Sequence, residues 1–262
     1  MMKRKKPIGD REMQTIMITG CSSGFGLETA RYFLEQGWKV IATMRVLRED
    51  LLPASDRLRL VRLDVTSAQS IAEAIAEAGE IDVLVNNAGV GMLNALEGAS
   101  HEAIANLFAT NTLGTIAMTQ AVLPRFRARR SGTIVNITSA VTLQPMPLLA
   151  VYTASKAAVN AFTASLALEL RPFNIRVGVI LPGRDPQTRF GENARRTMGQ
   201  LPESYAALGQ QILDSIQENA SVTRAVDVAQ AVWRIVNDPD APSRLPAGED
   251  ALAMAQASRS RE

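Results

Sequence analysis

Short runs of β-branched and other apolar residues alternate along this sequence with longer segments of helical period, and no other feature limits the fold as strongly. We expect six strands, at residues 15–19, 39–43, 58–63, 81–85, 133–137 and 176–181. Helices are expected between them, around residues 25–36, 67–78, 100–130 and 151–171, with Pro124 bending or ending the third. Strands that alternate with helices form βαβ units with right-handed crossovers. The sequence therefore predicts an α/β fold, a single doubly wound parallel sheet with helices on both faces.

The composition excludes several classes of protein and of site. The chain has 262 residues, of which 47% are hydrophobic, enough for a core of its own. Its 28 basic and 26 acidic residues leave a net charge of only +2, whereas disordered chains combine low hydrophobicity with high net charge. One cysteine, Cys21, and one histidine, His101, can form neither an internal disulfide nor a zinc site from the usual ligands. We therefore expect no metal, and a Ser-His-Asp triad would have to use His101.

Four positive charges lie within the first six residues, at Lys3, Arg4, Lys5 and Lys6, and +2 minus these four leaves −2 for the rest of the chain. A nucleic-acid-binding domain usually spreads its basic residues over a face of the fold, so we expect no nucleic-acid partner. No stretch of about 18 apolar residues occurs, and the start lacks the apolar core of a signal peptide. We expect a cytoplasmic protein that makes no membrane contact, with a basic, mobile tail at residues 1–13 and one domain at residues 14–262.

A glycine-rich turn, T-G-C-S-S-G-F-G, occupies residues 19–26 between the first expected strand and helix. Glycines at such a turn let the backbone approach a pyrophosphate, and the helix N-terminus offers it N–H groups and partial positive charge. The spacing differs from G-x-G-x-x-G, so the turn alone would suit a structural role equally well. Asp64-Val65 and N-N-A-G at 86–89 end later strands at the same edge and suit an adenosine. The expected nucleotide contacts are Gly20, Ser22, Ser23, Gly24, Phe25, Gly26, Asp64, Val65, Asn87, Ala88 and Gly89.

The end of the second strand bears on which coenzyme would bind. NAD-binding sheets usually place Asp or Glu there to bind the ribose 2′-hydroxyl, whereas a 2′-phosphate requires a cation. This chain has Met44 followed by Arg45. We therefore expect NADP(H) to be preferred, with Arg45 as the contact and NAD(H) as the alternative.

Tyr152 and Lys156 are four residues apart at the start of an expected helix, so their side chains share one face. A phenol titrates near pH ~10, and acid/base work near neutrality requires its pKa to fall by about 3 units, roughly 4 kcal/mol. One cation at ~4–5 Å in an effective dielectric of ~20 supplies about 3–4 kcal/mol. We expect Lys156 to lower the pKa of Tyr152.

These motifs, in this order, resemble the compact branch of the short-chain dehydrogenase/reductases, whose fold is Rossmann-like. The resemblance spans residues 15 to about 250 and rests on residues 19–26, 64–65 and 86–89, Asn111, Ser139 and YTASK at 152–156. It implies a hydride transfer between a nicotinamide coenzyme and an alcohol or carbonyl substrate. Tyr152 would then exchange the proton and Ser139 would orient the substrate oxygen. Lys156 would lower the Tyr pKa and hold the nicotinamide ribose, while Asn111 would position a water linked to the Lys.

One segment departs from the pattern of this family. The family usually has P-G-x-[apolar]-x-T after the sixth strand, with its last residues on the nicotinamide carboxamide. Here Pro182 and Gly183 are followed by Arg184, and Thr188 comes one position late. Pro182, Gly183 and Thr188 are the expected contacts, and the seating of the nicotinamide is the part of the site that the sequence defines least.

The resemblance also bears on substrate and assembly. Residues 188–220 are expected to form a substrate lid, with Arg195, Arg196 and Tyr205 as candidate contacts. TRFGENARR at 188–196 and RLPAGEDA at 244–251 are similar to 17β-hydroxysteroid and retinol dehydrogenases, which implies a secondary alcohol or ketone on an apolar skeleton, steroid- or retinoid-like. The family forms dimers or tetramers, so a homodimer or homotetramer is expected, with interfaces on the helices around 100–130 and 151–171.

Two other functions use part of the same pattern. A regulator that senses NADP(H) without turnover would not need Tyr152 and Lys156, which this chain has. A nucleotide-sugar epimerase would share YxxxK but usually has G-x-x-G-x-x-G spacing and a longer substrate domain, both absent here.

Overall fold

The computed structural model describes residues 13–186, 201–218 and 221–260, and within these ranges seven parallel strands form one sheet in the order β3-β2-β1-β4-β5-β6-β7. Strand order therefore reverses between β1 and β4, which places a crevice where the carboxyl ends of these strands meet. The strands are β1 (Thr15–Ile18), β2 (Lys39–Met44), β3 (Leu58–Arg62), β4 (Val83–Asn86), β5 (Gly132–Ile137), β6 (Ile175–Pro182) and β7 (Arg244–Ala247). The predicted doubly wound α/β fold is confirmed.

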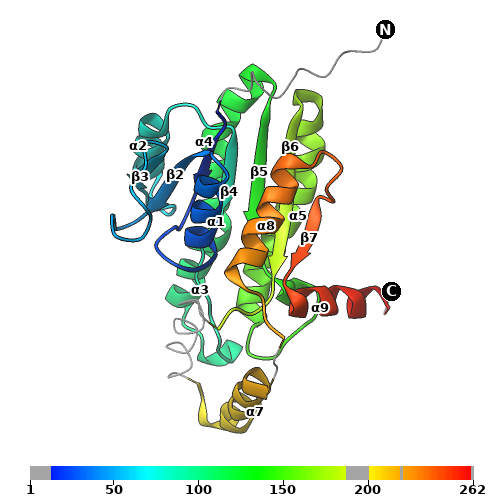
Figure 1. The fold of residues 1–262 in the computed structure, drawn as a ribbon. Helices are drawn as coiled ribbons and strands as arrows, with labels where there is room; N and C mark the ends of the chain where they lie inside the picture. Colours follow the sequence, from blue (N-terminus) through cyan, green and yellow to red (C-terminus); the bar gives the residue numbers. More distant parts are fainter. Residues whose placement is uncertain (1–12, 187–200, 219–220, 261–262) are drawn as a thin grey trace.

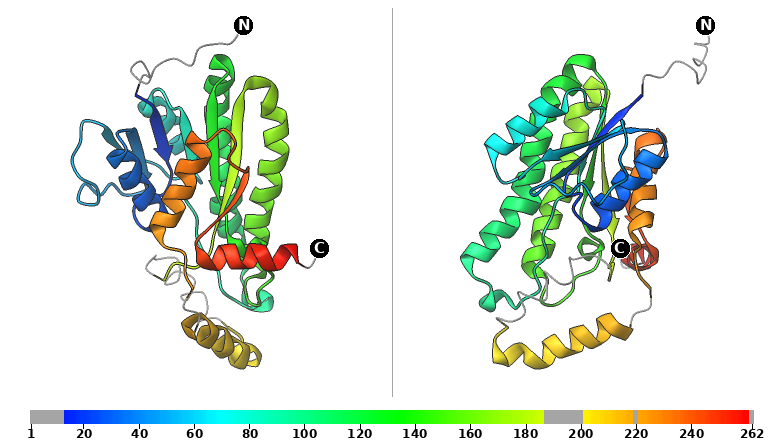
Figure 2. Two further views of the ribbon diagram at one scale, coloured as in Figure 1. Left: turned by 45° about the vertical axis from the view of Figure 1, so that its right-hand side comes forward. Right: turned by 60° about the vertical axis from the view of Figure 1, so that its left-hand side comes forward.

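Helices cover both faces of the sheet (Figures 1 and 2). One face packs against α1 (Gly24–Glu35) and α8 (Ala225–Asn237), and the other against α2 (Ala68–Ala78), α4 (Gly114–Arg129) and α5 (Ala150–Leu170). Successive strand residues alternate between the two cores: Ile16 and Ile18 of β1 face α1 and α8, and Met17 faces the other layer. Both faces of the sheet are therefore buried, as a parallel sheet requires.

The long helix expected over residues 100–130 is divided into three parts. It comprises α3 (His101–Phe108), a π-helical turn at Ala109–Leu113 and α4. Pro124 lies inside α4, which continues to Arg129, so the expectation that it could end the helix was wrong. The π-helical turn places Asn111 at an irregular point of the helix, and such turns are frequent at functional sites.

The C-terminal elements differ most from the sequence prediction. β7, α8 and α9 (Glu249–Arg259) were not expected. β7 has four residues, includes Pro246 and lies at the edge of the sheet, where a missing N–H is tolerated, so it lacks the apolar run typical of the inner strands. In Figure 1, α9 and α7 (Ala206–Glu218) lie at the end of the molecule where the strands finish.

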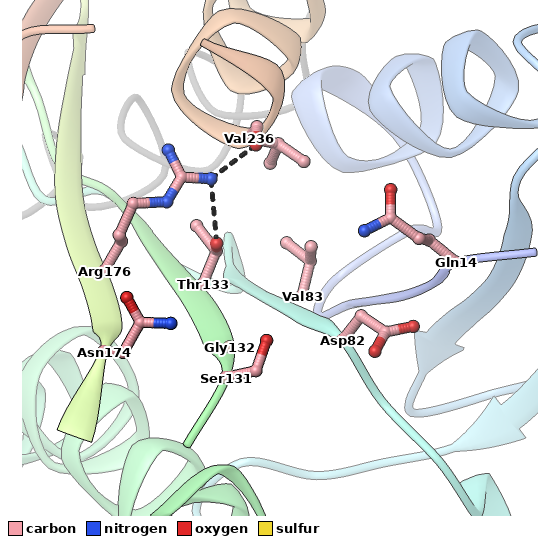
Figure 3. Close-up of a pocket in the computed structure, with 9 residues that line it drawn as sticks. All are labelled: Gln14, Asp82, Val83, Ser131, Gly132, Thr133, Asn174, Arg176 and Val236. Carbon is pink, nitrogen blue, oxygen red and sulfur yellow. Dashed lines mark hydrogen bonds between the residues drawn. The ribbon is translucent and has the colours of Figure 1, made fainter. Parts of the chain in front are cut away.

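A pocket of 170 Å³ opens at the opposite edge, among the first residues of β4, β5 and β6 (Figure 3). The guanidinium of Arg176 lines this pocket. It donates to the Ile235 carbonyl at 2.8 Å, to the Val236 carbonyl and to Thr133 Oγ1 at 3.2 Å. Burial lowers the pKa of Arg176, and the charge of Asp238 opposes this shift. Because the guanidinium meets carbonyls at the C-terminus of α8, this pocket holds a helix cap rather than reactive chemistry.

None of the helices among the described residues combines the length and apolar content needed to cross a membrane. The same residues contain no group of three or more His, Cys, Asp or Glu side chains arranged to hold a metal ion.

Candidate active site

The glycine-rich turn joins β1 to α1 at the carboxyl edge of the sheet. Gly20 has a φ of +75°, and a Cβ there would stand 2.9 Å from the Cα of Ala88. Only glycine fits so close an approach to the segment that follows β4. Asn87 secures the same contact, because its Nδ2 donates to the carbonyl oxygens of Thr19 and Gly20 at 2.9 and 3.1 Å. The turn and the N-N-A-G segment are therefore held together as one unit.

The N-terminus of α1 suits an anion. Ser23 has extended backbone before the helix, its side chain makes no capping hydrogen bond, and the first turn contains no acidic residue. Ser22 is exposed beside it, while Gly24 and Phe25 are half-buried. The first N–H groups of a helix carry partial positive charge, and here no side chain caps them. The chemistry of this donor set fits a pyrophosphate.

Arg45 is exposed immediately after β2, and the residue before it, Met44, is buried, so the strand ends without a carboxylate. At the end of β3, Asp64 Oδ1 accepts hydrogen bonds from Thr66 Oγ1 at 2.7 Å and from Thr66 N at 2.9 Å. These bonds and the charge of Arg45 hold the pKa of Asp64 below its ordinary value. Buried Val65 follows Asp64. A cation therefore lies where the sequence predicted one, at the end of the second strand.

Four expected catalytic residues come from three different parts of the fold, and all are buried: Asn111 from the π-helical turn, Ser139 from the segment after β5, where it precedes a 3-10 turn at Ala140–Thr142, and Tyr152 and Lys156 from the first turns of α5. Lys156 Nζ lies over the ring of Tyr152, 6.0 Å from the ring centroid. The side chain of Ser139 is hydrogen-bonded to Tyr152. The fold therefore brings the predicted acid/base pair and the predicted orienting hydroxyl together.

Burial raises the pKa of Tyr152 above its ordinary value, and the hydrogen bond with Ser139 opposes that shift. Lys156 Nζ donates to the carbonyl oxygen of Ile137 at 3.1 Å, and burial lowers the pKa of Lys156 to about 8. Both shifts come from the polypeptide alone. The expected lowering of the Tyr152 pKa by Lys156 stays a prediction.

Asn111 is fixed on two sides. Its Oδ1 accepts from Val90 N at 2.8 Å, and its Nδ2 donates to Val90 O at 2.9 Å and to Ser155 Oγ at 3.1 Å. A Cβ on Gly89 would stand 3.2 Å from Asn111 Oδ1 and 3.3 Å from Lys156 Nζ, so both side chains approach the backbone at Gly89. Sequence reasoning did not single out Ser155, although it lies within the YTASK motif. Its hydroxyl, which donates to Tyr152 O at 2.7 Å, links the two motifs.

The segment after β6 is described only in part. Pro182 ends the strand, and the N–H groups of Gly183 and Arg184 donate to side chains far along the chain, Thr223 and Asp250. Sequence reasoning did not assign either partner to this loop, because both lie far along the chain from it; Asp250 was noted only as part of RLPAGEDA at 244–251. Thr188, Arg195 and Arg196 lie outside the described residues.

Cys21 and His101 take no part in this arrangement. Cys21 is fully buried in the glycine-rich turn, and burial raises the pKa of its thiol to about 12. His101 is exposed at the first position of α3, after Ser100, whose side chain caps the helix by accepting from Ala103 N at 3.1 Å. Cys21 is therefore a small buried residue of the turn, and His101 an exposed residue at the start of a helix.

Comparison with known proteins gives consistent matches. A model of the short chain dehydrogenase family matches residues 14–199. The chain is 37% identical over 245 residues to 3-ketodihydrosphingosine reductase of Bacteroides thetaiotaomicron, covering 90% of this chain and 88% of that protein. It is 34% identical over 254 residues to retinol dehydrogenase 8 of Homo sapiens, covering 88% of this chain and 80% of that protein.

A solved structure also matches closely. The closed form of a serine dehydrogenase complexed with NADP⁺ has a TM-score of 0.78 and 31% sequence identity, and the match covers 90% of this chain and 95% of that one. Human 17-beta-hydroxysteroid dehydrogenase type 1 is also similar in sequence. The predicted resemblance to retinol and 17β-hydroxysteroid dehydrogenases is confirmed.

Proposed function

The chain belongs to the short chain dehydrogenase family and is an NADP(H)-dependent oxidoreductase of alcohols and carbonyl compounds, and we propose that Tyr152, Ser139, Lys156 and Asn111 form its catalytic site. The observation that carries this assignment is the buried contact of Tyr152 with Ser139 on one side and Lys156 on the other. A sensor without turnover would need none of these contacts.

Bound NADP(H) supplies or accepts the hydride, and the protein supplies placement and the proton. In carbonyl reduction, Tyr152 Oη donates its proton to the substrate oxygen. Ser139 Oγ orients the same oxygen by a hydrogen bond. Lys156 holds the coenzyme ribose, and its ammonium stabilises the phenolate that Tyr152 becomes. Asn111 fixes the backbone at Val90, and we assign to it the positioning of a water linked to Lys156, the role that the family resemblance implies.

We assign the coenzyme contacts to the residues already described. The turn at residues 19–26 and the N-terminus of α1 receive the pyrophosphate, and residues 64–65 and 87–89 line the adenosine. Arg45 meets the 2′-phosphate, for which a guanidinium provides two parallel N–H donors. Pro182 and Gly183, with Thr188 beyond the described part of the loop, receive the nicotinamide carboxamide.

The substrate is proposed to be a secondary alcohol or ketone on an apolar skeleton, steroid- or retinoid-like. Apolar side chains surround the approach to Tyr152: Met92 and Val141 pack with it, and Leu93 and Leu148 pack against Leu208 and Ile212 of α7. Leu148 has a φ of +62°, and such strain in a bulky residue is found most often near functional sites. Two relatives are named for apolar substrates, a ketodihydrosphingosine and retinol. We propose that α7 belongs to a substrate lid over residues 188–220.

Assembly and location are further parts of the proposal. Leu113, in the π-helical turn, and Leu168, on α5, are 60% and 63% exposed, and we propose that they lie in the interface of a homodimer or homotetramer. We propose that the protein is cytoplasmic, where its one cysteine would remain reduced, and that residues 1–13 form a basic tail outside the single domain. Size-exclusion chromatography with light scattering tests the assembly.

One assay tests the function. The protein is mixed with NADPH and a panel of aldehydes, ketosteroids, retinal and long-chain ketones, and loss of the reduced-nicotinamide absorbance is followed, with Tyr152→Phe as the blank. Turnover that needs Tyr152 and favours the apolar members supports the proposal. Tight NADPH binding without turnover on the whole panel would support the sensor instead.

A further inference from the structure

The loop that follows β6 is held by two buried side chains from distant parts of the chain. Gly183 N donates to Thr223 Oγ1 at 2.8 Å, and Arg184 N donates to Asp250 Oδ2 at 2.6 Å. The carbonyl oxygen of Arg184 accepts from Thr223 N at 2.9 Å. Three backbone groups of two consecutive residues are therefore bound, all by the same pair of residues.

Thr223 and Asp250 also bind each other. Thr223 Oγ1 lies 2.7 Å from Asp250 Oδ1 and 2.9 Å from the carbonyl oxygen of Ala247. The hydroxyl has one proton, which these two acceptors share. Asp250 Oδ1 further accepts from Ala251 N at 2.9 Å in the first turn of α9, where the helix dipole favours a carboxylate. Thr223 is fully buried and Asp250 is 5% exposed. We call this pair the loop clamp.

The close approach of the clamp leaves no room for a side chain on the loop. A Cβ at Gly183 would stand 2.1 Å from both carboxylate oxygens of Asp250. The glycine and the carboxylate therefore depend on each other, since the carboxylate can reach the N–H of Arg184 only across a residue without Cβ.

We propose that Thr223 and Asp250 are positioning residues that hold Gly183 and Arg184 where the nicotinamide end of the coenzyme is received. This inference rests on the proposed function, in which this loop meets the carboxamide. It explains how a loop with Arg184, Asp185 and Pro186 in place of the usual pattern is oriented. Its first residues are held by Asp250 of α9 and by Thr223 before α8, and the loop itself needs only Gly183 to admit the carboxylate. Neither residue touches the reacting atoms.

Two ligands separate this role from a general structural one. NADPH uses the whole site, whereas adenosine 2′,5′-bisphosphate has the 2′-phosphate and adenosine but no nicotinamide. We expect Asp250→Asn and Thr223→Val to weaken NADPH about tenfold, the effect of losing one hydrogen bond to a charged or buried group. The affinity for adenosine 2′,5′-bisphosphate should stay unchanged, and Thr223→Ser, which keeps the hydroxyl, should restore NADPH binding.

Asp227→Asn is the matched control. Asp227 is also an acidic residue in the first turn of a helix, α8, and its Oδ2 accepts from Arg224 N at 2.9 Å, but it does not contact the loop. This variant should have the native ratio of the two affinities even if its melting temperature falls. Clamp variants should also raise KM for NADPH more than they lower kcat.

The outcomes are distinguishable. If the native protein turns over NADPH but the clamp variants weaken both ligands equally, or neither, the clamp does not position the nicotinamide and only this inference fails. If no clamp variant folds, the clamp is a requirement of folding and the inference also fails. If the native protein does not bind NADPH, the proposed function itself fails.

Discussion

Lys156 Nζ lies over the ring of Tyr152 at 6.0 Å from its centroid, yet burial moves the pKa values of the two groups in opposite directions. Burial disfavours the charged form of each side chain, which is the phenolate of Tyr152 and the ammonium of Lys156. The pKa of Tyr152 therefore rises, and that of Lys156 falls to about 8. Burial therefore favours the neutral form of both groups, and Lys156 is the one of the two whose pKa lies near physiological pH.

Replacing Tyr152 by Phe should lower kcat for carbonyl reduction by about 10²- to 10⁴-fold, the usual contribution of a positioned proton donor. NADPH affinity should hardly change, because only the hydroxyl is lost. Steady-state kinetics and a fluorescence titration with NADPH check the two expectations. Tyr32→Phe, in the aromatic cluster with Trp233, is the control and should keep native kcat. A Tyr152→Phe variant with most of its activity would remove the phenol from the mechanism.

The rate should depend on pH through Lys156. Its pKa of about 8 means that the free enzyme loses the ammonium as the pH rises past this value. We expect kcat/KM for NADPH, which reports ionisations of the free enzyme, to be level at lower pH and to decline above about pH 8. In Lys156→Arg, whose charge persists, the decline should disappear although the overall rate is lower. A native profile that stays level to pH 10 would contradict the assignment.

The same pKa predicts the direction in which stability changes with pH. Lys156 titrates at about 8 in the folded protein and near 10.5 when unfolded, so between these values the unfolded chain binds more protons. The free energy of unfolding should therefore rise with pH in this window, by about 3 kcal/mol in total as far as Lys156 contributes. Urea denaturation at several pH values should show the rise in the native protein and in the exposed control Lys39→Met. Lys156→Met, in which the ionising group is gone, should lack it.

Sequence reasoning succeeded where the relevant relationship is local. The alternation of strands and helices predicts the sheet because a parallel pair needs a crossover between its strands. The spacing of Tyr152 and Lys156 places them on one helix face whatever surrounds them. The cation after β2 follows in the same way, since Arg45 directly continues the strand.

The parts that sequence reasoning missed depend on distant contacts. The pKa of Tyr152 is raised by burial under residues from several elements, which a four-residue spacing does not report. Thr223 and Asp250 lie 40 and 66 residues beyond their partners Gly183 and Arg184, and although Asp250 stands in RLPAGEDA, that segment does not tell which part of the chain it contacts. β7 is a short edge strand with a proline, so it carries little of the periodicity on which strand prediction depends.

Cys21 should be inert in the folded protein. Its side chain is fully buried, and the pKa of its thiol is raised to about 12, so almost no thiolate is present at pH 8. A disulfide reagent such as dithionitrobenzoate should label it only at the rate of unfolding, and labelling should become fast and complete in denaturant. If the native protein is labelled rapidly and NADPH prevents this labelling, Cys21 is not merely a small buried residue of the turn.

Coenzyme choice should reverse in part when Arg45 is replaced by Asp. The native end of β2 presents a guanidinium and no carboxylate, and the charge of Arg45 is close enough to Asp64 to affect its pKa. A carboxylate at residue 45 would repel the 2′-phosphate of NADPH and accept a hydrogen bond from the ribose hydroxyl of NADH, so the ratio of the two affinities should shift by at least about tenfold towards NADH. Arg48→Asp is the matched control, because Arg48 is an exposed arginine of the same loop that is already engaged with Asp50 at 2.7 Å. Dissociation constants for both coenzymes, measured for the three proteins, decide the matter. Equal ratios in Arg45→Asp and in the native protein would mean that selection of the 2′-phosphate lies with other residues.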